Sequence, residues 1–194
     1  MSSKKSNEKN AKAGFAKNIK TTLEAINLDP KQIKFLINIK NEKAFRDLGC
    51  GMIRDIQLKD RDQWEKLYRG YADFYKVEMN NQIHKTVWGW LHDKSHEVSG
   101  IVYEVDENIV ALAHYRRMPR PLKGNDIGFL DDLYVDPEYR GKKIGEKILN
   151  ELKEISKSKG WNLVRWITHD DNLRAKSLYD RVSEKTNWDV YELK

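Results

Sequence analysis

The chain has 194 residues, 39% of them hydrophobic and 34% charged, with six tryptophans and nine tyrosines. This composition excludes a wholly disordered chain and fits one ordinary domain with an extension, because so many aromatic side chains need a core. No run approaches the ~18 apolar residues of a membrane span, no apolar signal segment opens the chain, and the single cysteine, Cys50, excludes an internal disulfide framework, so we expect a cytoplasmic protein without a membrane partner.

The positive charge is concentrated in the first quarter of the chain. The formal net charge is +6, and residues 1–50 hold 11 Lys and Arg against 5 Asp and Glu, whereas residues 51–194 hold 25 of each kind. We therefore do not expect the main domain to bind nucleic acid. The basic segment is either a solvated or docking segment, or a module that binds nucleic acid or a partner.

The chain divides into a tail, an extension and a main domain. Residues 1–12 are polar and lysine-rich and are predicted to be a disordered basic tail. Residues 13–51 are predicted to form a helical N-terminal extension, because their apolar residues recur at helical spacing and Asp29 before Pro30 is a favourable helix start. The main domain is predicted at 52–194.

Helix and strand patterns alternate along the main domain. Apolar residues at helical spacing predict buried faces on the helices, while alternating or β-branched runs predict strands. The order is β-α-α-β-β-β-α-β-α-β, which indicates a mixed α/β (α+β) fold. We expect strands at 52–58, 98–105, 109–117, 127–135, 161–169 and 187–193, and helices at 59–75, 81–93, 142–159 and 172–182. The residues expected on the buried helix faces are Trp64, Leu67, Tyr68, Tyr71 and Phe74, then Ile144, Ile148, Leu152 and Ile155, then Leu173, Leu178 and Val182.

The stretch LDDLYVDPEYRGKKIGEKIL, residues 130–149, runs from a strand through a basic turn into a helix. The first N–H groups of a helix have no partner inside it, and the helix dipole favours negative charge there. Glycine lets a ligand approach the backbone, and the turn's cations add positive charge. The turn therefore suits a phosphate or pyrophosphate, although it matches neither the Walker nor the Rossmann glycine pattern. The alternative is a solvated basic turn.

This stretch resembles motif A of the GNAT superfamily of N-acetyltransferases, and DNLRAKSLYDRV, residues 171–182, is similar to its motif B. The resemblance covers residues 52–194 and is closest in look to the polyamine (diamine) and yeast-type histone/polyamine acetyltransferases. It implies a GNAT fold, a central mixed, mostly antiparallel sheet flanked by helices and splayed at strands 4 and 5. It also implies an acyltransferase that uses acetyl-CoA as co-substrate and needs no metal.

The resemblance implies where the acetyl-CoA lies. Asn172 would hydrogen-bond the pantetheine, although it is equally a helix cap. Lys143 departs from the family pattern, where glycine is usual, and a side chain there requires a negative φ; its ammonium either lies near the phosphates or weakens cofactor binding. The residues carried over for the cofactor are Leu133, Tyr134, Val135, Arg140, Gly141, Lys142, Lys143, Ile144, Gly145, Asn172 and Lys176.

The chemistry requires an amine that loses protons and a thiolate that gains one. The resemblance assigns Tyr179 as the acid for the thiolate, with a packing tyrosine as the alternative. Asp131 corresponds to the substrate-side acid and is the candidate base; a base acting through water, or a surface charge paired with an arginine, are the alternatives. The expected acceptor-side residues are Tyr71, Tyr75, Asp131 and Tyr115, with Trp88 and His114 also considered.

The acceptor is expected to be a small primary amine or a polyamine. A protein acetyltransferase acting on lysines or N-termini, and a non-catalytic acetyl-CoA-binding module, are the alternatives, and the sequence leaves a homodimer open. The five histidines, His84, His92, His96, His114 and His169, show no spacing typical of metal ligands.

Overall fold

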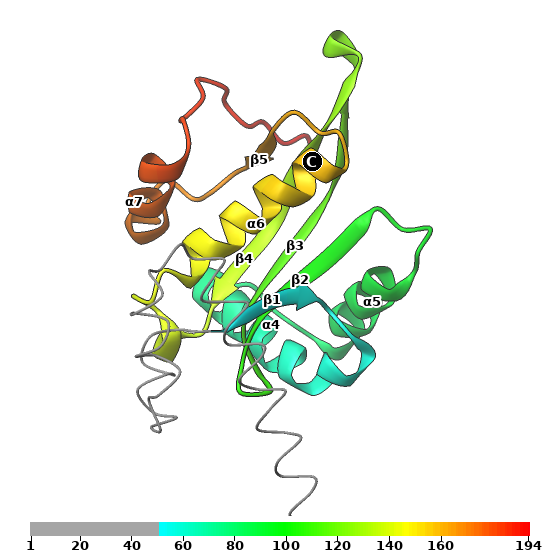
Figure 1. The fold of residues 1–194 in the computed structure, drawn as a ribbon, viewed down its shortest axis with the longest axis vertical. Coiled ribbons are helices and arrows are strands. Elements are labelled where there is room, and N and C mark those ends of the chain that lie inside the picture. Colours follow the sequence, from blue (N-terminus) through cyan, green and yellow to red (C-terminus); the bar gives the residue numbers. More distant parts are fainter. Residues whose placement is uncertain (1–50) are drawn as a thin grey trace, which may run out of the picture. The chain divides into compact units, whose positions relative to one another are not determined.

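The computed structural model describes residues 51–194, which belong to one compact unit that begins at Gly49. The predicted tail and helical extension lie outside the described residues. Four α-helices and five β-strands follow one another along the described part (Figure 1). They are β1 (Met52–Asp55), α4 (Arg61–Tyr75), α5 (Asn81–His92), β2 (Val98–Val105), β3 (Asn108–Arg120), β4 (Asn125–Val135), α6 (Ile144–Ser158), β5 (Val164–Trp166) and α7 (Leu173–Val182).

A five-stranded sheet in the order β1-β2-β3-β4-β5 forms the centre of the unit. The first four strands are antiparallel neighbours, and β5 runs parallel to β4. The mixed, mostly antiparallel sheet with flanking helices confirms the predicted fold class. Within the described residues, no helix is long and apolar enough to cross a membrane.

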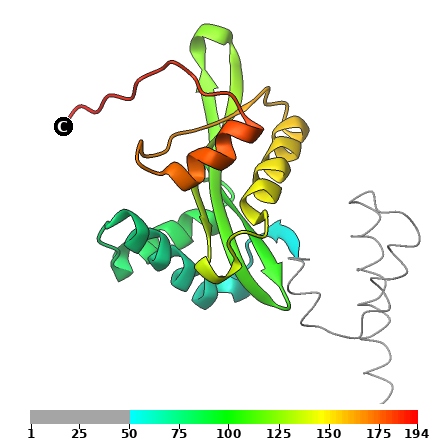
Figure 2. The ribbon, with the colours of Figure 1, turned by 90° about the vertical axis from the view of Figure 1, so that its left-hand side faces the viewer.

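The helices cover both faces of the sheet. Figure 2 shows α6 on one side of the strands and α4 with α5 on the other. Successive strand residues point to opposite faces, so Ile101 and Tyr103 pack in the α6 layer, whereas Val102 and Leu112 pack with α4 and α5. Two hydrophobic layers therefore hold the sheet between them.

The amphipathic patterns of α4 and α6 are confirmed in their centres. Trp64 and Leu67 of α4 are buried, and Tyr68 and Tyr71 are half-buried, but Phe74 at its end is 49% exposed. On α6, Ile144, Ile148 and Leu152 are buried, and Ile155 packs against them half-buried.

The predicted core face of α7 is largely wrong. Leu178 packs against the α6 layer, but Leu173 is 72% and Val182 39% exposed. None of the residues of α7 is fully buried, because the helix packs against the α6 layer through only two side chains, Leu178 and Tyr179.

The predicted closing strand at 187–193 is also wrong, since residues 183–194 contain no strand. Its alternating apolar residues stay exposed, Trp188 by 78% and Tyr191 by 89%. An alternating pattern marks a chain that can pair, but a strand forms only beside an available sheet edge. β5 is likewise shorter than expected, because its ladder with β4 spans only Val164–Trp166.

A bulge in β4 shapes the sheet where the site forms. His114 of β3 pairs with Asp132, and Tyr115 pairs with Leu130, so Asp131 is one extra residue in β4. A bulge bends its strand and raises the local twist. The ladder with β5 stops at Leu130, and β4 therefore continues to Val135 with no β5 residue beside it.

Candidate active site

A cavity of about 360 Å³ opens where β4 leaves β5, and α4, α6 and α7 supply its other walls. Most of the residues singled out from the sequence meet in it. They are Tyr71, Tyr75, Asp131, Leu133, Tyr134, Val135, Arg140, Gly141, Lys143, Ile144, Gly145, Asn172 and Tyr179.

The turn before α6 has the backbone geometry of an anion site. The Asp136 carboxylate accepts a hydrogen bond from Glu138 N at 2.9 Å, which starts a 3-10 turn over Pro137–Tyr139. Gly141 then adopts a φ of 84°. The first hydrogen bond of α6 runs from Lys147 N to Lys143 O at 3.0 Å, so the N–H groups at the start of the helix precede it and face the turn.

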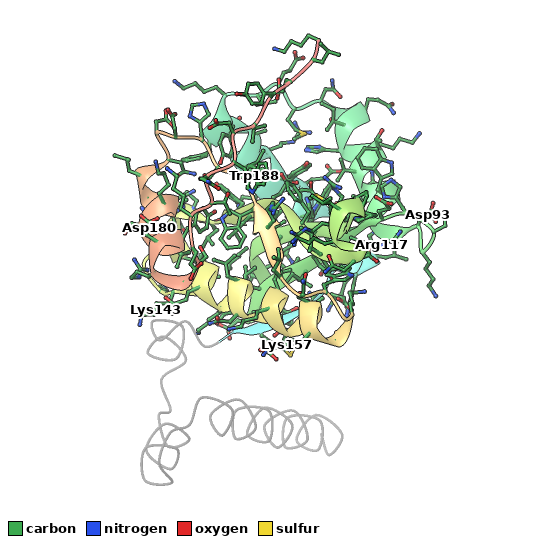
Figure 3. The ribbon with its side chains drawn as sticks, turned by 90° about the horizontal axis from the view of Figure 1, so that it is seen from above. Asp93, Arg117, Lys143, Lys157, Asp180 and Trp188 are labelled. Atoms are coloured by element: carbon green, nitrogen blue, oxygen red, sulfur yellow. The ribbon has the colours of Figure 1, made fainter. Side chains whose placement is uncertain are left out.

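Lys143 contradicts the expectation of a negative φ. Its φ is 59° and its ψ 18°, a left-handed conformation, and it is the N-cap residue of α6. The turn thus keeps the geometry that glycine would adopt and accepts the strain of a side chain. Figure 3 shows Lys143 at the start of α6, beside α7, the helix that carries Asp180. Lys143 contributes to the cavity wall.

Arg140 and Lys142, the other two cations of the turn, place their charged groups against different partners. Arg140 Nε donates to Val135 O at 2.9 Å, and its guanidinium lies over the Tyr134 ring at 5.4 Å from the centroid. Lys142 instead places its ammonium 5.1 Å from the Tyr139 ring centroid. Lys142 is not among the residues that line the cavity, so Arg140 and Lys143 are the cations of this turn that contribute positive charge to the wall.

Lys176, which the resemblance assigned to the cofactor, does not line the cavity either. Its ammonium donates to Asp170 O at 2.9 Å and thereby braces the loop before α7.

Asn172 caps α7 and also faces the cavity. Its side-chain oxygen accepts from Ala175 N at 3.3 Å, while its amide donates to Thr168 Oγ1 at 3.3 Å and to the Tyr75 hydroxyl at 3.4 Å. The expected cap is therefore present. Gly145 allows the two helices of this wall to approach, since a Cβ there would lie 3.2 Å from Leu178 Cδ2.

Tyr179 has the protonation state that an acid needs. Burial, followed by the nearby Tyr75, raises the pKa of Tyr179 to about 12, so its hydroxyl keeps its proton at neutral pH. Its ring packs against Trp166 at 5.2 Å between centroids, and its side chain lines the cavity. The Tyr179 side chain can therefore pack against Trp166 and also contact a ligand in the cavity.

Asp131, the bulge residue, carries a carboxylate at the cavity wall. Desolvation raises its pKa, and Arg116, whose Nε lies 3.2 Å from Asp131 Oδ1, acts in the opposite direction. Partial desolvation suits a group that must take up a proton or hold an ammonium.

Two of the expected acceptor-side tyrosines, Tyr71 and Tyr75 of α4, line the cavity, with their rings 5.1 Å apart. Burial, then the charge of Asp132, raises the pKa of Tyr71 well above its usual value. Both tyrosines therefore reach the cavity from one helix, about one turn apart.

Tyr115 does not line the cavity, which corrects its assignment to the acceptor site. It is 5% exposed and packs in the α6 layer, with its ring 6.4 Å from that of Trp161. Its neighbour His114 points to the α4 side, and adjacent strand residues cannot share a face. His114 and Trp88 are 1% and 7% exposed, so they belong to the core rather than the cavity surface.

Some lining residues were missed from the sequence. Arg174 and Arg181 of α7 contribute to the wall, as do Phe74, Glu146 and Trp166. The seven-residue spacing of the two arginines, which places both on one helix face, could have indicated them.

Near α7, three possible ligand residues for a metal, His169, Asp170 and Asp171, have their donor atoms within 4.8 Å of one another, and all three are exposed. The closest pair is His169 Nδ1 and Asp171 Oδ1 at 2.7 Å. An exposed group of this kind forms readily as a polar turn, and its geometry alone defines no metal centre.

Comparison with known proteins places this geometry in context. The chain matches the acetyltransferase (GNAT) family over residues 62–183. It is 26% identical over 143 residues to the D-amino-acid N-acetyltransferase HPA3 of Saccharomyces cerevisiae, which covers 73% of this chain and 89% of that protein. It is also 46% identical over 57 residues to the thialysine N-epsilon-acetyltransferase of Bos taurus, covering 29% of this chain and 33% of that protein.

Solved structures share the fold. An aminoglycoside N-acetyltransferase AAC(6')-Iy in complex with CoA superposes with a TM-score of 0.64 at 14% identity, covering 74% of this chain and 94% of that one. The ribosomal-protein-alanine N-acetyltransferase of Brucella melitensis biovar Abortus 2308 gives a TM-score of 0.64 at 20% identity, covering 75% and 99%. With the family match spanning more than half of the sequence, the chain belongs to the GNAT family of N-acetyltransferases.

Proposed function

We propose that the protein transfers the acetyl group of acetyl-CoA to the primary amine of a small molecule, by direct attack within a ternary complex. The observation that carries the proposal is that the turn before α6, the part of β4 beyond its ladder with β5, Tyr179 and Asp131 all meet in one cavity. An anionic, amide-containing thioester and a cationic amine each find complementary groups there.

The residues present fit acetyl-CoA. The turn at Gly141 and Lys143 and the first N–H groups of α6 would hold its pyrophosphate. Beyond Leu130, β4 lies beside no β5 residue, so its backbone from Leu133 to Val135 can pair with the amides of the pantetheine arm. When bound, the thioester supplies the electrophilic carbonyl carbon.

The chain's own groups then serve the transfer. Asp131 would bind the substrate ammonium, and backbone N–H groups of β4 would stabilise the oxyanion. The amine forms a C–N bond as the C–S bond breaks, and the Tyr179 hydroxyl would protonate the departing thiolate.

The acceptor we propose is an amine on an amino acid. A polyamine favours several carboxylates, whereas the cavity wall carries two, Asp131 and Glu146. Arg174 and Arg181 line the same cavity as Asp131, so partners for a carboxylate and for an ammonium are present together. The names of two similar proteins, which act on D-amino acids and on thialysine, point the same way.

The test is release of free thiol from acetyl-CoA with D-phenylalanine, thialysine, spermidine or a lysine-containing peptide as the acceptor. We expect turnover with an amino acid. Turnover of spermidine alone would show that the acceptor is a polyamine rather than an amino acid. Turnover of the peptide alone would indicate a protein acetyltransferase. Binding of acetyl-CoA without turnover of any amine would overturn the enzymatic function in favour of a binding module.

A matched pair of variants tests the role of Asp131. Both Asp131 and Asp126 lie on β4 and pair with an arginine of β3, at 3.2 Å and 3.0 Å, with their side chains 31% and 34% exposed. Only Asp131 lines the cavity. Asp131→Asn should raise the KM for the amine about tenfold or more, as expected when a charge-assisted contact of about 1.5–3 kcal/mol is lost, whereas Asp126→Asn should leave it unchanged.

A further inference from the structure

A buried chain of hydrogen bonds leads from the core to the cavity. Trp64 Nε1 donates to His114 Nε2 at 2.9 Å, and His114 Nδ1 lies 2.8 Å from Asp132 Oδ2. Trp64 is fully buried and His114 is 1% exposed. The chain therefore joins α4 to β3 and β4 beneath the surface of the cavity.

The indole of Trp64 fixes the tautomer of His114. An indole N–H can only donate, so His114 Nε2 must accept and carries no proton. The ring proton then lies on Nδ1 and is donated to the Asp132 carboxylate. His114 is held as a neutral imidazole that orients Asp132, and protonation of its second nitrogen would set two donors against each other.

Asp132 is joined to the cavity through the tyrosines of α4. The Tyr68 hydroxyl donates to Asp132 Oδ2 at 3.3 Å. The Tyr71 ring stacks beside that of Tyr68 at 6.3 Å between centroids, and burial and then the charge of Asp132 hold the pKa of the Tyr71 hydroxyl well above its usual value, so it stays protonated near that carboxylate. Tyr71 lines the cavity, and its remaining lone pairs are available to an N–H group of the substrate.

We infer that Asp132, oriented by His114 and Trp64, receives a proton from the substrate amine through the Tyr71 hydroxyl. An ammonium group loses two protons on becoming an amide, and the departing thiolate gains one. The other passes to the Tyr71 oxygen as the Tyr71 proton passes to Asp132, which later releases it to water. This inference rests on the proposed function, in which Asp131 binds the ammonium, and it makes His114 and Trp64 positioning residues.

The groups that face Asp132 come from one helix, α4, and two strands, β3 and β4. They are Tyr68 and Tyr71 on α4, His114 on β3 and the adjacent Asp131 on β4. The hydrogen bonds from Tyr68 and His114 hold the Asp132 carboxylate in one orientation.

His84 of α5 provides the matched control. It is 1% exposed, its ring lies 5.8 Å from that of Trp64 and 6.2 Å from that of Tyr68, and neither ring nitrogen has a hydrogen-bond partner. His84→Phe therefore disturbs the packing of the same aromatic cluster without touching the hydrogen bonds to Asp132.

The experiment measures kcat and kcat/KM of the full chain as a function of pH. The substrate is whichever of D-phenylalanine, thialysine and spermidine the wild type acetylates fastest. Tyr71→Phe should lower kcat about 100-fold, in the range of a lost proton-transfer group, with the Kd of acetyl-CoA unchanged. His114→Phe should also lower kcat and move the acidic limb of kcat/KM to higher pH, because a carboxylate that loses a donor is protonated more readily.

The conservative variant separates orientation from packing. His114→Asn keeps an N–H near the position of Nδ1 and should restore most of kcat and the wild-type acidic limb, whereas His84→Phe should keep the wild-type pH profile whatever its stability. Tyr71→Phe within twofold of wild type, or equal pH profiles for His114→Phe and His84→Phe, would overturn the inference. A wild type that releases no thiol with any amine would instead overturn the proposed function.

Discussion

At the scale of single residues, Lys143 holds a conformation that suits glycine. Its φ of 59° places a Cβ in the left-handed region, which costs about 1–2 kcal/mol for an L-residue. Lys143→Gly removes this strain but also gives the unfolded chain more freedom, so we expect a net gain of stability of at most about 1 kcal/mol, measured by urea unfolding.

The same variant distinguishes two roles of the Lys143 ammonium. If it contacts the phosphates, Lys143→Gly weakens acetyl-CoA binding, most visibly at low salt, because the lost interaction is screened by ions. Equal or tighter binding at all salt concentrations would show that the side chain has no part in holding the cofactor.

Tyr179 is the second residue whose role a single substitution can test. Tyr179→Phe keeps the ring on Trp166 and removes only the hydroxyl, whose pKa of about 12 keeps it protonated. We expect kcat to fall about 100-fold with little change in melting temperature. A kcat equal to that of wild type would leave Tyr179 as a packing residue.

At the scale of helices and strands, a buried ion cluster joins β1 to the turn before α4. Arg54 donates to Asp60 at 2.6 Å and 2.8 Å and also contacts Glu104 of β2. The Asp60 side chain is 3% exposed. Burial opposes ionisation, but the hydrogen bonds from Arg54 and Gln57 N prevail and lower the pKa of Asp60 below its usual value.

Arg54→Met therefore leaves a buried carboxylate without its partner and should cost about 3–5 kcal/mol in the free energy of unfolding. Arg61→Met, which breaks a solvent-exposed pair with Glu65 at 3.3 Å, should cost less than about 1 kcal/mol. In the wild type, a lowered pKa gives stability that is present above the ordinary value of 3.8 and is lost as the pH falls below it. Urea unfolding at neutral and acidic pH measures both effects.

Local patterns predicted the helices well and the long-range pairings less well. The spacing of Trp64, Leu67 and Tyr68 identified α4, and the glycine and cations of the turn indicated an anion site. The exposure of Leu173 and the unpaired segment 187–193 could not be foreseen, because both depend on which surface lies opposite. A hydrophobic pattern predicts which side chains of a segment can be buried. Whether they are buried depends on the surface that the folded chain places opposite them.

The residues of the site were also predicted well from local motifs and less well where they depend on long-range pairing. Motif residues such as Gly141, Asn172 and Tyr179 lie in the cavity wall. Tyr115 was misplaced because it adjoins His114 on one strand, and the extra residue at Asp131 was not visible in the sequence. The hydrogen bonds of His114 join residues 50 and 18 positions apart, a distance over which no motif extends.

At the scale of the whole described unit, several buried tyrosines make the fold sensitive to alkali. Burial raises the pKa of Tyr68, Tyr71, Tyr115 and Tyr134, and raises that of Tyr179 to about 12 from 10.0. The folded state thus keeps protons that the unfolded state releases, so the tyrosines' contribution to stability is fully present below the ordinary value and is lost as the pH rises through 10 to about 12.

We therefore expect the melting temperature to fall steeply in this alkaline range, together with the appearance of tyrosinate absorbance. Tyr191→Phe, which removes a hydroxyl from a residue that is 89% exposed, should leave the curve in place. Full tyrosinate absorbance near the ordinary tyrosine value, before any loss of helical signal, would contradict the prediction.

The long hairpin of β3 and β4 reaches beyond the other elements of this unit (Figure 1). Leu122 at its tip is 96% exposed, and the strands pair from Arg120 and Asn125 inward as far as the bulge at Asp131. A break between Lys123 and Gly124 would divide the chain into fragments that each hold part of the cavity, with Tyr71, Phe74 and Tyr75 before the break and the other lining residues after it. We expect two such fragments, expressed together, to reassemble through the paired strands of the hairpin and to restore acetyl transfer, which would then report their association.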